Sequence, residues 1–226
     1  MADTKISSLT ALTGADTDTA ADVLAIVDTS VTTTKKILVD ELAVALASTQ
    51  AEVNAMTSTN TLITPALNKI ILGTEVASTS GTAIDYTGFP AGVRRIKIMF
   101  AGVSTNGNDS WLVQLGDAGG FETTGYASCG SLLDTGVATS SSTAGFIIRT
   151  ANSSRVASGV LTLDLEDSTD FTWVSSHNLM DVTAATATFL GAGSKSLSAE
   201  LTQIRITTTG GTNTFDAGVV NISYER

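Results

Sequence analysis

From residue 73 onward, hydrophobic and polar positions alternate with a period of two, which is the pattern of half-buried β-strands. Ile96, Ile98 and Phe100, for example, share one face of an expected strand. Glycine, asparagine and serine separate the alternating segments. The segments predicted as strands lie near 74–86, 93–103, 110–116, 126–133, 144–149, 158–166, 171–176, 186–190, 202–208 and 217–225. This spacing predicts an antiparallel β-sandwich of jelly-roll type.

Before residue 73 the pattern is mixed. Apolar runs predict strands at 23–27 and 34–38, and acidic residues at 40 and 41 open an expected helix over 40–47. Pro65 suits the first turn of a second helix, whose apolar stripe has the spacing i, i+3, i+4 and runs to residue 72. That stripe consists of Leu67, Ile70 and Ile71. We therefore expect a small mixed α/β module with a neck helix over 1–72, followed by the sandwich over 73–226.

Composition narrows the class of protein. Of the 226 residues, 42% are hydrophobic and 15% are charged, which suits a folded chain that buries a sizeable core. The net charge of −10 argues against nucleic-acid binding, because an acidic surface repels phosphate. No apolar run is long enough to cross a bilayer, and the first residues lack the pattern of a signal peptide.

The segment 5–46 contains the runs Lys5-Ile-Ser-Ser-Leu-Thr-Ala-Leu-Thr-Gly-Ala-Asp16, Val23-Leu-Ala-Ile-Val-Asp28, Lys35-Lys-Ile-Leu38 and Asp40-Glu-Leu-Ala-Val-Ala-Leu46. With these residues it resembles the N-terminal segment of many tailed-bacteriophage virion proteins. Two further stretches, 48–57 with 62–67 and 111–126, are similar to elements of phage tail fibres, although Met56 stands where the family usually has glycine.

This resemblance implies a virion structural protein, most simply a short homotrimeric tail fibre assembled in the host cytoplasm. The N-terminal module would dock on a tail adaptor, tube or baseplate, with a capsid as the less favoured partner, and the sandwich would bind a host-surface glycan or protein. No enzymatic activity and no cofactor are expected. The expected attachment residues are Ile6, Leu9, Leu12, Ile26, Ile37 and Leu42, and the expected trimer-neck residues are Leu67, Ile70 and Ile71. The alternative is a capsid decoration or head-fibre protein that binds no receptor.

Polar loops are the expected receptor-binding surface, because Ser, Thr, Asn and Gly offer many hydrogen bonds with little charge preference. These loops are 104–110, 117–125, 135–143 and 151–154. The candidate receptor-binding residues in or beside them are Asn106, Asn108, Asp109, Asp117, Tyr126 and Asn152.

The acidic residues raise two other possibilities, glycan hydrolysis and calcium binding. Glycan hydrolysis needs paired carboxylates, and the densest acidic run is Asp164, Glu166, Asp167 and Asp170. Alternation with leucines makes the first two outward strand residues, so a solvated strand and turn are expected there. A calcium site at this run or at 106–109 is the other possibility, but neither matches the calcium-loop pattern, and we expect no metal.

The remaining reactive and aromatic residues are expected to be structural. Cys129, the only cysteine, is expected to be buried as a small apolar side chain. His177, the only histidine, is expected at a strand end as a loop or interface residue. Core packing is expected for the large aromatic side chains, with carbohydrate stacking as the alternative; they are Phe89, Trp111, Phe121, Tyr126 and Trp173.

Overall fold

The structure, a computed structural model, describes residues 23–28, 33–38, 70–183 and 187–226. The chain divides into two compact units, Met1–Asn68 and Lys69–Arg226, which are described separately. In the first unit, β1 (Val23–Asp28) and β2 (Thr33–Leu38) form an antiparallel hairpin that includes the backbone of Ile26 and Ile37. The expected helix over 40–47, and with it Ile6, Leu9, Leu12, Leu42 and Leu67, lies outside the described residues.

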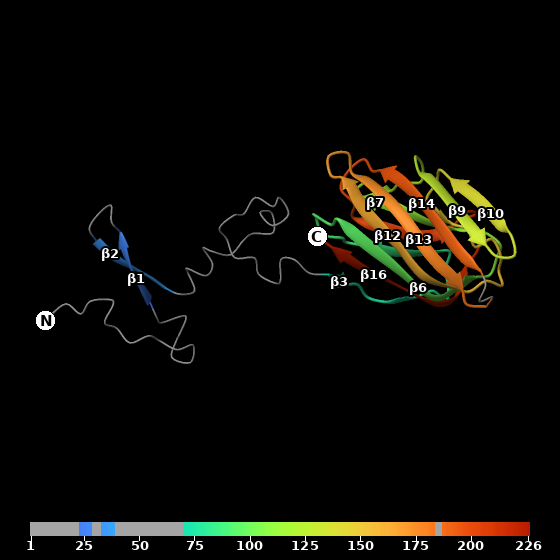
Figure 1. Cartoon of the computed structure of the whole chain (residues 1–226), viewed down its shortest axis with the longest axis horizontal. Helices are drawn as coiled ribbons and strands as arrows, with labels where there is room; N and C mark the ends of the chain where they lie inside the picture. Colours follow the sequence, from blue (N-terminus) through green and yellow to red (C-terminus); the bar gives the residue numbers. More distant parts are fainter. Residues whose placement is uncertain (1–22, 29–32, 39–69, 184–186) are drawn as a thin grey trace. The chain divides into compact units, whose positions relative to one another are not determined.

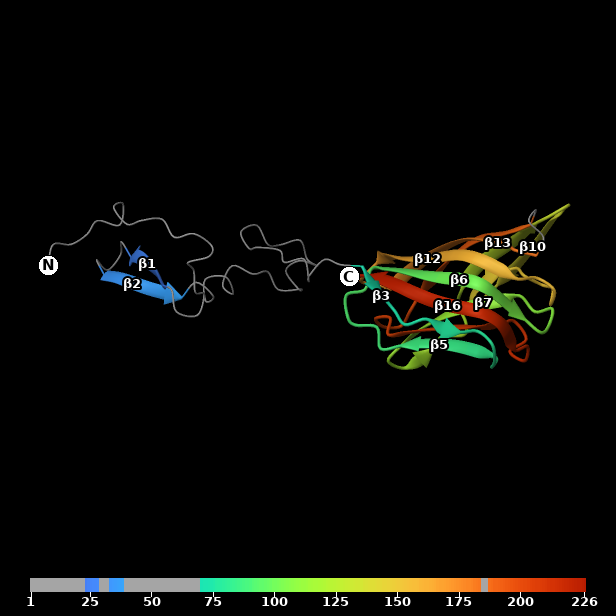
Figure 2. The same cartoon turned by 90° about the horizontal axis from the view of Figure 1, so that it is seen from below.

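The second unit is an all-β sandwich in which two antiparallel sheets pack face to face, and no helix occurs in its described residues (Figures 1 and 2). Its strands are β3 (Ile71–Leu72), β4 (Val76–Ala77), β5 (Ala83–Thr87), β6 (Arg95–Thr105), β7 (Trp111–Asp117), β8 (Gly120–Phe121), β9 (Ala127–Leu133), β10 (Val137–Ser142), β11 (Phe146–Ile148), β12 (Ala157–Asp167), β13 (Thr172–Asp181), β14 (Thr188–Ser196), β15 (Gln203–Thr208) and β16 (Phe215–Glu225).

The two sheets differ in size. The larger has nine strands in the order β10-β9-β14-β13-β12-β6-β16-β3, with β4 also paired to β16. The smaller has the order β11-β7-β15-β5, with β8 paired to β7. The prediction of an antiparallel sandwich is therefore confirmed. Figure 1 looks onto the larger sheet, and Figure 2 shows β5 of the smaller sheet in the layer behind it.

The core lies between the sheets and consists of the side chains that the period-two pattern points inward. Ile96, Ile98 and Phe100 of β6 are each at most 3% exposed. Across the layer they meet Trp111, whose ring stacks on Phe100 with ring centroids 5.8 Å apart. Other inward residues that the pattern predicts correctly are Leu161, Leu163, Ile204, Ile206, Val220 and Ile222, all buried. Leu165 and Tyr224 are partly buried against the same core.

The expected helix does not continue through residue 72. Ile71 and Leu72 form β3, paired with Tyr224 and Ser223 of β16, and Ile70 precedes the strand with 67% of its surface exposed. A short apolar run fits a helix or a strand equally well by spacing, and here the edge of β16 supplies backbone partners that a helix would not use. The helix prediction is therefore wrong at Ile71 and Leu72, and the trimer-neck role of Ile70 and Ile71 stays a prediction.

A second correction concerns 135–143, which was expected as a loop. Residues 137–142 form the edge strand β10, paired antiparallel with β9. Its sequence, Val-Ala-Thr-Ser-Ser-Ser, contains no run of large alternating apolar residues, so the period-two signal is weak. Edge strands need only one paired side and little burial, which is why serine and threonine are sufficient here.

The sandwich has two distinct ends. At the root end, Ile71 and Arg95 lie beside the last residues of β16, so the chain enters next to Arg226. At the distal end, Thr105 pairs with Phe215, and Trp111 pairs with Thr208. The loops 106–110, 149–156 and 209–214 therefore belong to the distal end, whereas 118–126 and 197–202 belong to the root end.

One outward surface of the larger sheet contains no charged side chain, and we call it the neutral face. Register and alternation assign its positions on five neighbouring strands. They are Val137, Thr139 and Ser141 of β10; Ala127, Cys129, Ser131 and Leu133 of β9; Thr188, Leu190, Ala192, Ser194 and Ser196 of β14; Thr172, Val174, Ser176, Asn178 and Met180 of β13; and Ser158, Val160 and Thr162 of β12. Asp164, the next outward residue on β12, pairs with Arg95 and marks the limit of the face.

Candidate functional site

Three of the predicted receptor-binding residues tie the distal loops together. Asn106 Oδ1 accepts a hydrogen bond from Thr214 N at 2.9 Å, and the backbone N–H of Asn106 donates to Thr214 O at 2.9 Å. Asp109 Oδ2 accepts from Gly210 N at 3.1 Å. These contacts join the loops 106–110 and 209–214, which are about a hundred residues apart in the chain.

The third distal loop is attached in the same way. Asn108 Oδ1 accepts from Ser153 N at 3.0 Å, and Thr150 Oγ1 donates to Asp109 O at 3.2 Å. Asn152 closes its own turn by accepting from Ser154 N at 2.8 Å. The structure thus brings together Asn106, Asn108, Asp109 and Asn152, as one candidate recognition site at the distal end.

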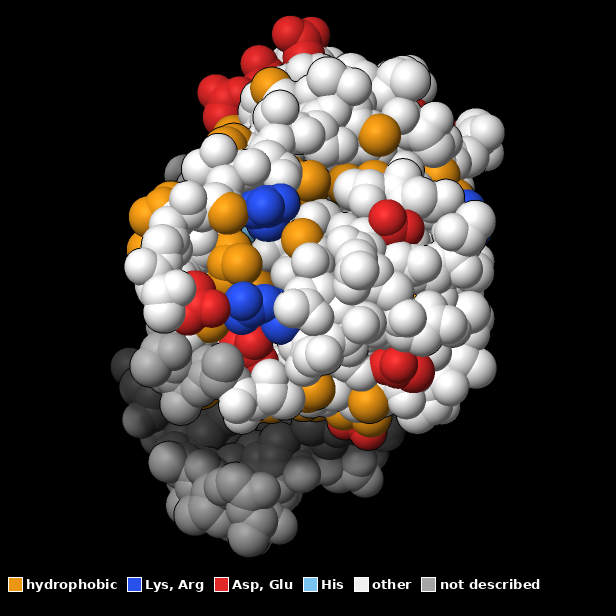
Figure 3. Space-filling model, turned by 90° about the vertical axis from the view of Figure 1, so that its right-hand side faces the viewer, with side chains coloured by type: hydrophobic (Ala, Val, Ile, Leu, Met, Phe, Trp, Pro, Cys, Tyr) orange, Lys and Arg blue, Asp and Glu red, His pale blue; other side chains and the backbone are white. Residues whose placement is uncertain are grey.

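The chemistry of this site is polar and nearly neutral. Asn106, Asn108 and Asn152 accept their loop hydrogen bonds through the side-chain Oδ1 atoms. All three residues are exposed, and their Nδ2 groups are hydrogen-bond donors. Figure 3 views the distal end: most of the surface is white, the colour of backbone and of side chains that are neither charged nor hydrophobic, and Lys or Arg side chains lie beside hydrophobic ones in a hollow. Such a surface can bind hydroxyl and carbonyl oxygens through neutral donors.

A buried ion-pair network supports the distal loops. Arg155 Nη1 contacts Asp181 Oδ2 at 2.8 Å, and Arg155 Nη2 contacts Asp134 Oδ2 at 3.0 Å. Asp181 is 1% exposed, and its Oδ1 accepts from Thr183 N and Thr183 Oγ1. Burial raises the pKa of Asp181, but the hydrogen bonds from Thr183, Val156 and Arg155 outweigh it, so the pKa lies below its usual value. The network fixes the start of β12 against the β9–β10 turn.

One distal residue has a strained backbone. Ala151 has φ of 47°, in the left-handed region that only glycine adopts without a Cβ penalty. Ala151 immediately precedes Asn152, and the turn that Asn152 closes holds Ala151 in this strained conformation.

Replacing Ala151 with glycine is expected to raise the free energy of unfolding by about 0.5–1 kcal/mol, because the Cβ contact disappears while the turn is retained. Urea unfolding of the full chain measures this change. Ala91→Gly is the matched control, since Ala91 is exposed in a turn with no positive φ, and it should lower the stability instead. Equal destabilisation by both changes would contradict the strain at Ala151.

Two predicted receptor-binding residues lie at the other end and are buried. Asp117 is 4% exposed: its Oδ2 accepts from Ser198 Oγ at 2.5 Å and its Oδ1 from Gly119 N at 2.7 Å, and these bonds lower its pKa. Tyr126 is 3% exposed, and its hydroxyl accepts from Leu115 N and donates to Glu122 O. Burial raises the pKa of Tyr126. Neither side chain is on the distal surface, so neither residue belongs to the candidate site.

The root end holds a second concave region between the free edge of β5 and the start of the domain. A cavity of about 300 Å³ is lined by ten residues, among them Phe89 and Tyr224, whose rings meet edge-on with centroids 5.6 Å apart. Tyr86, also in its wall, donates to Val220 O at 2.6 Å, and burial raises its pKa to about 12. Because the chain enters at this end, the distal loops remain the better candidate for contact with a large partner.

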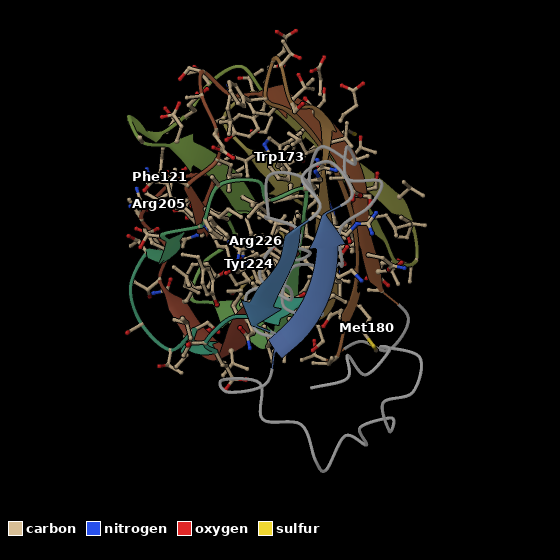
Figure 4. All side chains as sticks on the ribbon, turned by 90° about the vertical axis from the view of Figure 1, so that its left-hand side faces the viewer. Phe121, Trp173, Met180, Arg205, Tyr224 and Arg226 are labelled. Atoms are coloured by element: carbon tan, nitrogen blue, oxygen red, sulfur yellow. The ribbon has the colours of Figure 1, made fainter. Side chains whose placement is uncertain are left out.

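The aromatic residues follow the core expectation except for one. Phe89, Trp111, Tyr126 and Trp173 are each at most 8% exposed. Phe121 is partly exposed and packs against Arg205, whose guanidinium carbon lies 4.2 Å from the ring centroid, as Figure 4 shows for the labelled pair. Arg205 in turn contacts Asp85 through two hydrogen bonds of 2.8 and 2.7 Å, which raise its pKa.

The acidic run is divided between a strand and a turn. Asp164 faces outward from β12 and forms an ion pair with Arg95 at 2.5 Å. Asp167 Oδ1 accepts from Thr169 N at 2.6 Å, and this turn hydrogen bond lowers the pKa of Asp167. Glu166 and Asp170 are exposed. Their places match the outward strand and turn positions that alternation predicts.

Two predictions for single residues are wrong. Cys129 is exposed, because it points outward from β9 onto the neutral face instead of into the core. His177 is not at a strand end: it lies within β13, is 6% exposed, and points inward over Gly191 of β14. The strand was predicted to end at residue 176, but β13 continues to Asp181, so His177 occupies one of its buried inward positions.

Sequence reasoning missed several residues that build the distal site. Arg155, Ser153, Gly210 and Thr214 all contact predicted site residues or support their loops. The Gly210-Gly211 pair was the available signal, since it marks a turn, but a turn signal gives no indication of which loops meet. In the residues that the structure describes, no group of three or more His, Cys, Asp or Glu is placed to hold a metal ion.

Among 23–28, 33–38, 70–183 and 187–226, no helix qualifies as a membrane span. Comparison with models of known protein families, with curated proteins and with solved structures found no match.

Proposed function

We propose that this chain is a structural component of a tailed-phage virion, a short homotrimeric tail fibre. Residues 1–72 dock on a tail adaptor, tube or baseplate, and the distal loops of the sandwich bind a glycan or protein on the host surface. The jelly-roll class of the sandwich, the α/β character of 1–72 and a neck helix ending before Ile70 belong to this proposal as predictions.

One observation carries the proposal beyond the resemblance of 5–46: the arrangement of the two ends of the sandwich. The chain enters beside Ile71, and Arg226 follows the end of β16 at the same root end, away from the distal loops. The distal end carries the polar loops with Asn106, Asn108 and Asn152. A domain attached at its root and open at its tip suits presentation of a recognition surface.

The distal surface supports a weak, charge-independent contact. Its asparagines supply neutral donors, and the loops are fixed by hydrogen bonds to one another, so few side chains have to be ordered on binding. Three chains in a fibre, and several fibres on a particle, multiply a weak single-site affinity by raising the effective concentration.

Competition for adsorption tests the proposal. Purified full-length protein is added to cells of the strain on which the particle carrying this chain grows, and free phage is counted over time. We expect the protein to slow adsorption in proportion to its concentration. Folded protein that leaves adsorption unchanged would contradict receptor binding and favour the capsid decoration alternative.

A matched pair of variants locates the surface in the same assay. Ser153→Glu places a charge on an exposed distal loop whose backbone, not side chain, makes the bond to Asn108. Thr124→Glu places the same charge on an exposed loop of the root end. The first is expected to weaken competition by about tenfold, equivalent to about 1.4 kcal/mol, and the second to have no effect.

A further inference from the structure

The neutral face differs from the rest of the surface in charge. The chain has 22 acidic and 12 basic residues, yet none of them points outward from β10, β9, β14 or β13. The outward side of the smaller sheet, by contrast, carries Asp85 and Arg205. Figure 4 labels Met180 of the neutral face on the flank opposite Phe121 and Arg205. Charged residues are mostly exposed in folded proteins, so their absence from the outward positions of four adjacent strands needs a cause.

The relief of the neutral face suits close contact with another surface. Small side chains such as Ala192 and Ser176 occupy its centre, and Val160, Val174 and Met180 rise above them with 37–43% of their surface exposed. Beside Val160 lies a hollow of about 410 Å³, which Asn178 also lines. Protruding aliphatic side chains next to a hollow allow two such surfaces to interlock.

Area and charge together indicate the occupant. The neutral face spans about seven residues on each of five strands that lie about 4.8 Å apart, which is roughly 550 Å² before side-chain relief and of the same order as the ~800 Å² that each partner buries in a standard interface. Two molecules that each carry a net charge of −10 repel one another over most of their surfaces. Copies of the chain associate without opposed like charges where each turns its neutral face toward its neighbours.

We propose that the neutral face is the surface through which copies of this chain associate. The inference rests on the proposed function in one respect only, which is that both require self-association. The inference specifies which surface the copies use. The outward side of β10, β9, β14, β13 and β12 becomes buried, and the distal loops stay free to bind a receptor. An acidic or basic partner would gain nothing from a surface without charges, which is why a second copy is the favoured occupant.

Sedimentation of the full chain at micromolar concentrations tests the inference. Ser176→Glu and Ala192→Glu each place one negative charge at neighbouring central positions of the neutral face. Thr87→Glu is the matched control, because it places the same charge at an exposed outward strand position of the smaller sheet. We expect the wild type and Thr87→Glu to sediment as oligomers, with masses that are multiples of the 23.1 kDa chain mass. Each neutral-face variant is expected to dissociate with a constant at least about tenfold higher.

Cys129 provides a second readout without substitution at the surface. Its thiol is exposed on β9, beside Ala192 of β14, so an associated copy would cover it. Modification by a small maleimide should be slow in concentrated wild-type protein and become faster on dilution. In Ser176→Glu it should be fast at both concentrations, while the thermal unfolding temperature stays near that of the wild type.

The outcomes separate the two proposals. Wild-type association that persists unchanged in Ser176→Glu and Ala192→Glu, with Cys129 still reactive, would overturn the neutral face as the interface and leave self-association standing. A wild-type chain that sediments at 23.1 kDa would overturn this inference and the homotrimer in the proposed function together. The adsorption assay would still report on receptor binding in that case.

Discussion

Replacing Arg155 with methionine is expected to lower the free energy of unfolding by about 3 kcal/mol. Among the residues that the structure describes, the guanidinium is the hydrogen-bond partner of Asp181 Oδ2, and Asp181 is 1% exposed. Without it, a buried carboxylate oxygen loses its hydrogen bond and its counter-charge, which costs far more than the loss of a surface pair. Methionine keeps most of the aliphatic volume that lies near Phe189. Urea unfolding of the full chain at neutral pH measures the effect.

Two further variants assign that loss to the buried charge. Asp134→Asn removes the other partner of Arg155, which is 27% exposed at its side chain, and should cost less than about 1 kcal/mol. The double variant Arg155→Met with Asp181→Asn should regain part of the stability, because the amide carries no charge. A single Arg155→Met variant within about 1 kcal/mol of the wild type would show that Asp181 is not dependent on the ion pair.

The second large effect is a loss of stability between about pH 6.5 and pH 4, caused by His177. Burial lowers the pKa of His177 in the folded chain to about 4, whereas an exposed histidine in the unfolded chain has a pKa of 6.5. As the pH falls below 6.5, the unfolded chain binds a proton that the folded chain does not, so unfolding becomes more favourable. The loss is complete near pH 4, and 2.5 pKa units correspond to about 3 kcal/mol.

His177→Leu isolates this contribution. The variant has no proton to bind at this position, so its stability should change little between about pH 6.5 and 4.5, a range in which carboxylates remain mostly ionised. The two imidazole nitrogens have no hydrogen-bond partner among the described residues, so replacement by leucine removes no side-chain hydrogen bond there. The same pH dependence in wild type and variant, followed by urea unfolding, would assign the effect to other groups.

Alternation predicted the strands whose inward residues are large. Large apolar residues recur at every second position within β6, β15 and β16, and each of them is buried: Ile96, Ile98, Phe100, Ile204, Ile206, Val220 and Ile222. The same reasoning failed for β10, where the strand is stabilised by backbone pairing with β9 and by its edge position. It also failed for Ile71, because the choice between helix and strand depended on β16, which lies about 150 residues further along the chain.

The candidate site was predicted in part for the same reason. Asn106, Asn108, Asp109 and Asn152 were identified from loop composition, and the fold brings them together. Asp117 also follows a predicted strand in a polar loop, yet it is buried. Its Oδ2 accepts a hydrogen bond from the hydroxyl of Ser198, which is 81 residues further along the chain. Local sequence indicates that a polar residue follows a strand, but the distant donor decides whether that residue is buried.

The shared location of Ile71 and Arg226 has a practical consequence for anyone who engineers this domain. A peptide or fluorescent protein fused after Arg226 would be held at the root, next to the incoming chain and away from the distal loops. An epitope inserted after Gly211, an exposed glycine with φ of 67°, would instead be displayed at the tip. The domain therefore offers two separate attachment points, one for immobilising the protein and one for presenting cargo.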